Sequence, residues 1–177
     1  MQLYNFSESY IKSVENGKKF HSEHKTWSGK GTLQYTDYLK NLIKRHNIKT
    51  ILDFGSGKGI QYTKFQLDKL LAVEVMCYDP CIHGLEKWPN GQFDMVIALD
   101  CITLAGKNNL PWLYSEFSKW AQKCVYIASQ VESPGKLEKQ NYLEDENKVV
   151  YPEDLIIESI DMSKFYIMNN HKFIYPR

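Results

Sequence analysis

The chain has 177 residues and a formal net charge of +1, with 43% hydrophobic and 24% charged residues. These values are those of one ordinary globular domain, and they exclude the collagen-like, disulfide-scaffold and largely disordered classes. No apolar run approaches the roughly 18 residues of a membrane helix, and the first residues lack the basic-then-apolar pattern of a secretory signal. We therefore expect a cytoplasmic protein, away from membranes, that forms a single domain over residues 1–177.

The basic residues are almost all lysines, since only Arg45 and Arg177 of the 22 are arginine. Arginine's planar guanidinium is the usual group for bidentate phosphate recognition. A net charge near zero also gives no strong field to attract a polyanion. The composition therefore argues against nucleic acid as a partner and favours a small molecule, with a protein partner as the remaining alternative. The four cysteines are expected to be reduced thiols.

The first fifty residues are polar and rich in lysine, and they predict helices. A short helix is expected over residues 8–16, ended by Gly17. Residues 1–32 are expected to form an N-terminal helical cap segment that precedes the core of residues 33–177. In residues 36–48, apolar side chains recur at helical spacing between lysines, which predicts an amphipathic helix.

From residue 50 onward, short β-rich runs alternate with helical segments. The predicted strands are 50–54, 72–78, 94–99 and 124–130, and the predicted helices are 61–71 and 110–123. Strands that alternate with helices pair in parallel, because the helix carries the chain back across the sheet. Residues 164–168 and 171–175 predict a β-hairpin. The expected fold is therefore α/β, with a mostly parallel sheet, helices on both faces and an antiparallel C-terminal hairpin.

Residues 132–151 form the longest segment without a regular pattern. The segment is rich in charges and contains Pro134-Gly135. Long loops in compact domains are either functional lids or flexible segments. The sequence leaves both alternatives open.

The most informative segment is residues 51–60, Ile-Leu-Asp-Phe-Gly-Ser-Gly-Lys-Gly-Ile, in which a strand leads through a glycine-rich turn into a helix. Glycine lets a ligand approach the backbone closely. A Walker A loop would need glycine at Leu52 and Ser or Thr at Gly59, and the dinucleotide fingerprint would need glycine or alanine at Ile60. What remains is Asp-x-Gly-x-Gly-x-Gly, led by Asp53. An acidic residue there suits a ligand with a cationic amino group better than a pyrophosphate.

This loop resembles motif I of the class I S-adenosylmethionine-dependent methyltransferases. In that family an acidic residue at the end of the next strand binds the ribose hydroxyls of the cofactor, and Asp79 matches it in position and type. The family also opens its following strand with an aromatic-Asp pair, which Phe93-Asp94 matches; we expect Asp94 itself to be structural. The resemblance spans about residues 33–177 and is to the compact single-domain members of bacteria and phages.

The resemblance implies a Rossmann-like fold, S-adenosylmethionine as the cofactor, and a cofactor site built around the glycine loop. The implied cofactor-binding residues are Asp53, Gly55, Ser56, Gly57, Gly59, Asp79, Pro80 and Asp100, with Trp27 and Gly29 of the N-terminal segment closing over the pocket. No metal site is expected, because His21 and His24 have no matching pair of Cys or His residues.

Two departures from the family pattern limit what the resemblance implies. Only thirteen residues follow Asp79 before the next strand, so the helix and strand usual at this point are expected to be shortened or lost. Cys81, Ile82 and Leu85 in this short segment are the candidates for contacts with adenine. The residues after Asp100 lack the histidine of many relatives, so no catalytic base is assigned.

The expected function is methyl transfer to a small-molecule or sugar-type acceptor by in-line displacement. A methyl group on a sulfonium is already activated, so the protein contributes mainly proximity and alignment. The alternative is a methyltransferase-like partner or scaffold subunit without activity. A nicotinamide-dependent enzyme is a third hypothesis, which the mismatch at Ile60 disfavours.

Overall fold

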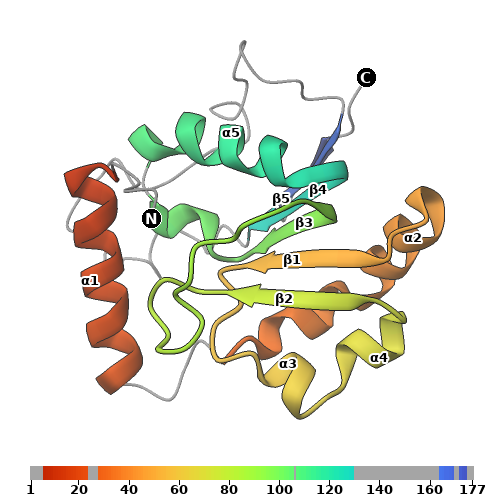
Figure 1. Cartoon of the computed structure of the whole chain (residues 1–177), viewed down its shortest axis with the longest axis horizontal. Helices are drawn as coiled ribbons and strands as arrows, with labels where there is room; N and C mark the ends of the chain where they lie inside the picture. The colour runs from red at the N-terminus through yellow and green to blue at the C-terminus, as the bar shows by residue number, and fades with distance from the viewer. Residues whose placement is uncertain (1–5, 24–27, 106, 130–163, 170–171, 175–177) are drawn as a thin grey trace.

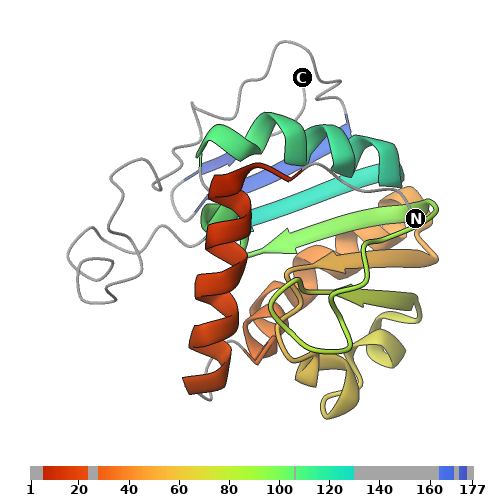
Figure 2. The same cartoon turned by 60° about the vertical axis from the view of Figure 1, so that its left-hand side comes forward.

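The computed structural model describes residues 6–23, 28–105, 107–129, 164–169 and 172–174. These residues form a six-stranded sheet in the order β2-β1-β3-β4-β5-β6, with helices on both faces (Figure 1, Figure 2). The predicted α/β, Rossmann-like fold with a mostly parallel sheet is confirmed. Trp27, His24 and the loop of residues 132–151 lie outside the described residues.

The sheet is parallel except at its last strand. The strands are β1 (Thr50–Phe54), β2 (Glu74–Tyr78), β3 (Phe93–Leu99), β4 (Ala121–Ser129), β5 (Phe165–Asn169) and β6 (Lys172–Ile174). β1 pairs in parallel with β2 and β3, β3 with β4, and β4 with β5. β6 runs antiparallel to β5, with Ile174 opposite Ile167. The first strand of the predicted hairpin thus extends the parallel sheet.

The helices differ widely in length. They are α1 (Glu8–Glu23), α2 (Thr36–His46), α3 (Ile60–Thr63), α4 (Leu67–Leu71) and α5 (Leu110–Trp120), with short 3-10 turns η1 (Lys30–Tyr35), η2 (Ile102–Ala105) and η3 (Lys107–Asn109). In the described part of the chain, no helix is both long and apolar enough to cross a membrane. No helix or strand lies within residues 79–92, so the predicted loss of the elements between β2 and β3 is confirmed.

Alternate side chains of the central strands enter two apolar clusters, one on each face of the sheet. One cluster joins Leu52 of β1 and Val96 of β3 to side chains of α1 and α5. Phe117, from the aromatic stripe of α5, is fully buried in it. The other cluster joins Ile51 and Ile97, the neighbouring residues on the same strands, to side chains of α2 and α4. The core therefore has the three-layer arrangement of a doubly wound fold.

α1 is longer than the sequence predicted, because Gly17 does not end it. The helix continues to Glu23, and Gly17 lies buried in its middle. A Cβ at position 17 would overlap Cys81 Sγ, so the glycine lets α1 approach the turn that follows β2. α1 stands at the end of the sheet toward which β1 and β2 point (Figure 1). Open α/β sheets bind their ligands at this end.

The predicted helix of residues 61–71 is instead two short helices, separated by Gln66 in the left-handed region with φ of 51°. In an unbroken helix, Gln61 and Leu67 would point about 120° apart. Both side chains are nevertheless fully buried, Gln61 against the glycine loop and Leu67 in the core. The break lets both side chains be buried at once.

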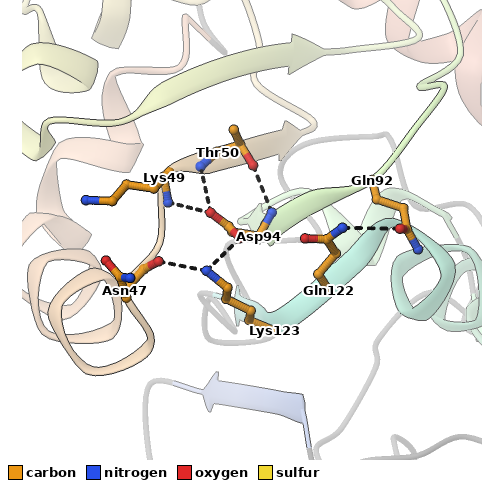
Figure 3. Close-up of polar contacts among 7 residues, drawn as sticks. All are labelled: Asn47, Lys49, Thr50, Gln92, Asp94, Gln122 and Lys123. Carbon is orange, nitrogen blue, oxygen red and sulfur yellow. Dashed lines mark hydrogen bonds and ion pairs between the residues drawn. The ribbon is translucent and has the colours of Figure 1, made fainter.

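Asp94 has the structural role predicted for it (Figure 3). Its Oδ2 accepts hydrogen bonds from the N–H groups of Lys49 and Thr50, at 2.6 and 3.2 Å. Its Oδ1 forms an ion pair with Lys123 Nζ at 2.7 Å. Lys123, predicted as helical, belongs to β4, which begins directly after Trp120. Asp94 therefore ties the starts of β1, β3 and β4 together, at the end of the sheet opposite α1.

Candidate functional site

The predicted site residues lie at the carboxyl ends of three neighbouring strands. The glycine loop of residues 55–59 follows β1, Asp79 follows β2, and Asp100 follows β3. β2 lies on one side of β1 and β3 on the other, so the winding direction of the chain reverses between β1 and β3. Open α/β sheets bind ligands in the crevice at such a switch point. The structure thus brings together residues that are far apart in the sequence.

The glycine loop is a tight turn that uses its own N–H groups within the chain. Its three glycines have φ of 76°, 59° and 67°, in the region that favours glycine. The N–H groups of Gly55 and Ser56 donate to Tyr78 O, at 2.7 and 3.1 Å. The N–H of Gly57 donates to Asp79 Oδ2 at 2.8 Å. Phosphate-binding loops instead point such groups at the ligand, so this geometry agrees with the exclusion of a pyrophosphate loop.

Asp79 is buried and orders the glycine loop. Its Oδ2 accepts the hydrogen bond from Gly57, and its Oδ1 accepts one from the N–H of Cys81 at 2.9 Å. Each carboxylate oxygen has two lone pairs, so ribose hydroxyls can still donate to this group. Pro80 follows in the same turn and is half-buried. The roles of Asp79 and Pro80 as cofactor ligands remain predictions.

Asp53 is the most deeply buried carboxyl of the site, with 1% of its surface exposed. Its Oδ2 accepts hydrogen bonds from Tyr62 Oη at 2.7 Å and from Gln61 Nε2 at 3.0 Å. Among the described residues, its Oδ1 has no hydrogen-bond partner and no cationic side chain forms an ion pair with it. Burial raises the pKa of Asp53 to about 6, against the lowering effect of the two hydrogen bonds. Near neutral pH Asp53 is therefore largely ionised, and no cationic side chain of the described residues forms an ion pair with it.

Gly29 packs against the glycine loop, next to Ser56 O and the side chain of Gln61. The preceding residue, Ser28, accepts a hydrogen bond at its carbonyl from the N–H of Ile60, at 3.2 Å. Gly29 has φ of 91°, and a Cβ there would overlap Gln61 Oε1 and Ser56 O. Glycine is therefore required for the segment before η1 to pack on the loop. The role of Gly29 as a cofactor contact remains a prediction.

Asp100 is exposed and has φ of 57°, which is uncommon for a residue other than glycine. Its N–H donates to Ala128 O at 2.8 Å. Its carboxylate accepts hydrogen bonds from Tyr35 Oη at 2.9 Å and from Gln34 Nε2 at 3.2 Å. η1 therefore reaches across the switch point and fixes Asp100. Strained residues held by their surroundings are common at functional sites.

Sequence reasoning missed the four residues that hold these carboxylates, namely Gln34, Tyr35, Gln61 and Tyr62. Gln61 and Tyr62 lie two and three residues after the end of the glycine loop, so their proximity to Asp53 could have been inferred from the tight turn. Tyr35 lies 65 residues before Asp100, and no local pattern indicates that the two meet.

The remaining candidates lie in the turn after β2. Cys81, Ile82 and Leu85 are half-buried, and their proposed contacts with adenine remain predictions. Burial raises the pKa of Cys77 and of Cys81 to about 12, so neither thiol is activated as a nucleophile. No three His, Cys, Asp or Glu side chains within the described ranges are placed to hold a metal ion.

The chain matches no protein-family model, no curated protein and no solved structure. The functional argument therefore rests on the geometry of the site.

Proposed function

We propose that the chain is an S-adenosylmethionine-dependent methyltransferase that acts on a small-molecule or sugar-type acceptor by in-line methyl transfer. The observation that carries the proposal is the buried Asp53 carboxylate, whose Oδ1 has no partner and no cation beside it among the described residues. A buried charge is costly unless it is paired. A ligand that brings a cationic group to the glycine loop would supply the missing partner.

The residues present fit the amino acid and ribose parts of S-adenosylmethionine. Asp53 Oδ1 would accept hydrogen bonds from the ammonium group, and Asp79 would accept them from the ribose hydroxyls. The three glycines of the loop let a ligand approach its backbone closely. When bound, S-adenosylmethionine supplies a methyl group that its sulfonium already activates. The chain then has to bind the cofactor and the acceptor, align them and exclude water. None of these tasks requires a catalytic base.

A nicotinamide dinucleotide fits the same geometry less well. The N–H groups of Gly55, Ser56 and Gly57 already donate within the chain, whereas a pyrophosphate needs free N–H groups. Two buried carboxylates, Asp53 and Asp79, would also repel it. The same repulsion, together with a net charge of +1, supports a small acceptor over a nucleic acid.

The alternative proposal is a methyltransferase-like partner or scaffold subunit without activity. Two features favour it: no helix or strand lies in residues 79–92, and the residues after Asp100 offer no histidine as a base. A scaffold, however, has no need for a buried carboxylate that no described side chain pairs with. We therefore keep the enzyme as the first proposal.

Turnover separates the two proposals. The chain is incubated with S-adenosylmethionine and panels of small alcohols, amines and sugars, and the formation of S-adenosylhomocysteine is followed. We expect the wild type to form S-adenosylhomocysteine only when an acceptor is present. We expect Asp53→Asn to form none. Cofactor binding without turnover on any panel would favour the scaffold.

A further inference from the structure

Two side chains that follow the glycine loop occupy one oxygen of Asp53. Tyr62 Oη and Gln61 Nε2 both donate to Oδ2, at 2.7 and 3.0 Å, and neither donates to Oδ1. The same Gln61 amide also donates to Ser56 O at 3.1 Å. The amide therefore ties the carboxylate to the backbone of the glycine loop.

Both donors are held in place by their surroundings. Gln61 is fully buried, and its Oε1 lies against Gly29, where a Cβ would overlap it. Tyr62 lies in the first turn of α3, where its N–H donates to Gly59 O at 3.1 Å. Its ring packs against the apolar cluster on the α2 and α4 face of the sheet. The two donors are therefore preorganised around Oδ2 before any ligand binds.

We propose that Gln61 and Tyr62 are positioning residues for ligand binding: they hold Asp53 by Oδ2 and present its Oδ1, in the ionised form, to the cationic group of the ligand. The inference rests on the proposed function, because it takes the ammonium of S-adenosylmethionine as that group. Under this proposal, Gln61 and Tyr62, which lie outside the glycine loop, keep Asp53 ionised.

The electrostatics of the site give these hydrogen bonds their importance. Besides Tyr62, the titratable groups that face Asp53 are Cys77 of β2, Asp79 after β2, and Cys101 after β3. Within the described residues, none of these groups is a cation. Burial is the main cause that raises the pKa of Asp53, Asp79 adds to it, and the hydrogen bonds from Tyr62 and Gln61 oppose it. Without them the pKa of Asp53 would be higher, and a larger fraction of the carboxyl would be protonated near neutral pH.

The first test follows the Asp53 carboxyl by NMR in protein labelled with carbon-13 at its aspartate carboxyls, without ligand. The wild type is expected to titrate near pH 6. Tyr62→Phe keeps the ring and removes the donor, so the midpoint should rise by about one pH unit, the scale of one hydrogen bond to a charged group. Gln61→Met, which removes the amide at similar length, should raise it in the same direction.

Tyr166→Phe is the matched control for this titration. It also removes a tyrosine hydroxyl that is hydrogen-bonded to another side chain, His46 Nε2 at 2.8 Å, but on a different part of the sheet. Its Asp53 midpoint should equal that of the wild type. An unchanged midpoint in folded Tyr62→Phe, or in Gln61→Met where Tyr62→Phe does not fold, overturns the inference.

The second test measures S-adenosylhomocysteine binding by calorimetry across the pH range. Tyr62→Phe should bind about three-fold more weakly than the wild type at about pH 6.5, and should recover at about pH 8.5, where Asp53 is ionised again. An equal loss at both pH values would indicate a merely structural role and overturn the inference. If the midpoints shift in the NMR titration but the wild type binds no cofactor, the proposed function fails, while the control of Asp53 by Gln61 and Tyr62 stands.

Discussion

At the scale of single residues, burial makes the ionised form of Asp53 unfavourable. Folding buries it and raises its pKa from 3.8 to about 6. An acid whose pKa is raised in the folded state binds its proton more tightly there. Its contribution to stability is therefore fully present below about pH 4 and is lost as the pH rises through 6. At neutral pH the folded chain therefore retains a buried charge that no described cationic side chain pairs with.

Asp53→Asn is therefore expected to stabilise the protein while it abolishes ligand binding. The amide keeps an acceptor for Tyr62 and Gln61 and removes the buried charge. We expect the free energy of unfolding to rise by about 1–3 kcal/mol at neutral pH, the scale of a two-unit pKa shift. Chemical denaturation at about pH 5 and pH 7.5 measures this gain, which should be larger at the higher pH. A less stable variant at neutral pH would contradict the account.

Part of this site could be predicted from the residues alone. Asp53, Asp79 and Asp100 each come at or just after the end of a predicted strand, and parallel strands end at the same edge of a sheet, so their proximity follows from the pattern. Tyr35 could not be predicted as a partner of Asp100, because the orientation of η1 depends on tertiary contacts. The burial of Asp53 without a cation likewise appears only in the folded chain.

At the scale of elements, residues 28–35 connect the two sides of the switch point. The carbonyl of Ser28 accepts from the first N–H of α3, and Gly29 packs on Gln61. At the other end of the segment, Tyr35 holds Asp100. The segment therefore supports Asp53 of β1 and Asp100 after β3 without being part of either loop.

Gly29→Ala is expected to weaken both stability and ligand binding. The left-handed backbone costs roughly 1–2 kcal/mol for alanine, and the new Cβ would displace Gln61 and thereby release Asp53. Gly91→Ala is the matched control, because Gly91 also has positive φ, 107°, but nothing lies within 4 Å of its Cβ position. Thermal unfolding and calorimetry of both variants are the measurements. Equal cofactor affinity in the two variants would show that the segment does not support the site.

The ends of the helices were harder to predict than the fold, because tertiary contacts determine them. Gly17 indicated the end of a helix, but it is a point of close approach between α1 and Cys81. The helical pattern of residues 61–71 concealed a break that lets Gln61 be buried against the glycine loop and Leu67 in the core. In both cases a distant contact outweighs the local preference.

At the scale of the whole molecule, the two ends of the sheet have different roles. The amino end is tied by Asp94, and the carboxyl end is occupied by the candidate site and covered by α1 (Figure 1). The alternation of strands and helices was enough to predict the parallel sheet. It did not predict that β5 would pair in parallel with β4, because a hairpin pattern specifies only the pairing of its own two strands.

Asp94→Ala is expected to destabilise the whole fold without changing the site. Burial opposes its ionisation, but the hydrogen bonds from Lys123, Lys49 and Thr50 lower the pKa of Asp94 below its usual value. Its contribution is therefore present above about pH 4 and is lost as the pH falls further. We expect a loss of about 2–3 kcal/mol at neutral pH, measured by denaturation, with unchanged cofactor affinity under conditions where the variant is folded. A stability equal to that of the wild type would contradict this role.

The central claim is that the glycine loop with its buried Asp53 binds a ligand with a cationic amino group. Isothermal titration calorimetry of the purified chain with S-adenosylmethionine and S-adenosylhomocysteine, with NAD as the control, tests it most directly. The account predicts micromolar binding of the first two ligands at about pH 8, no binding of NAD, and weaker binding below about pH 6 as Asp53 takes up its proton. Absence of binding of both ligands by the folded chain at about pH 8, or binding of NAD alone, would contradict it.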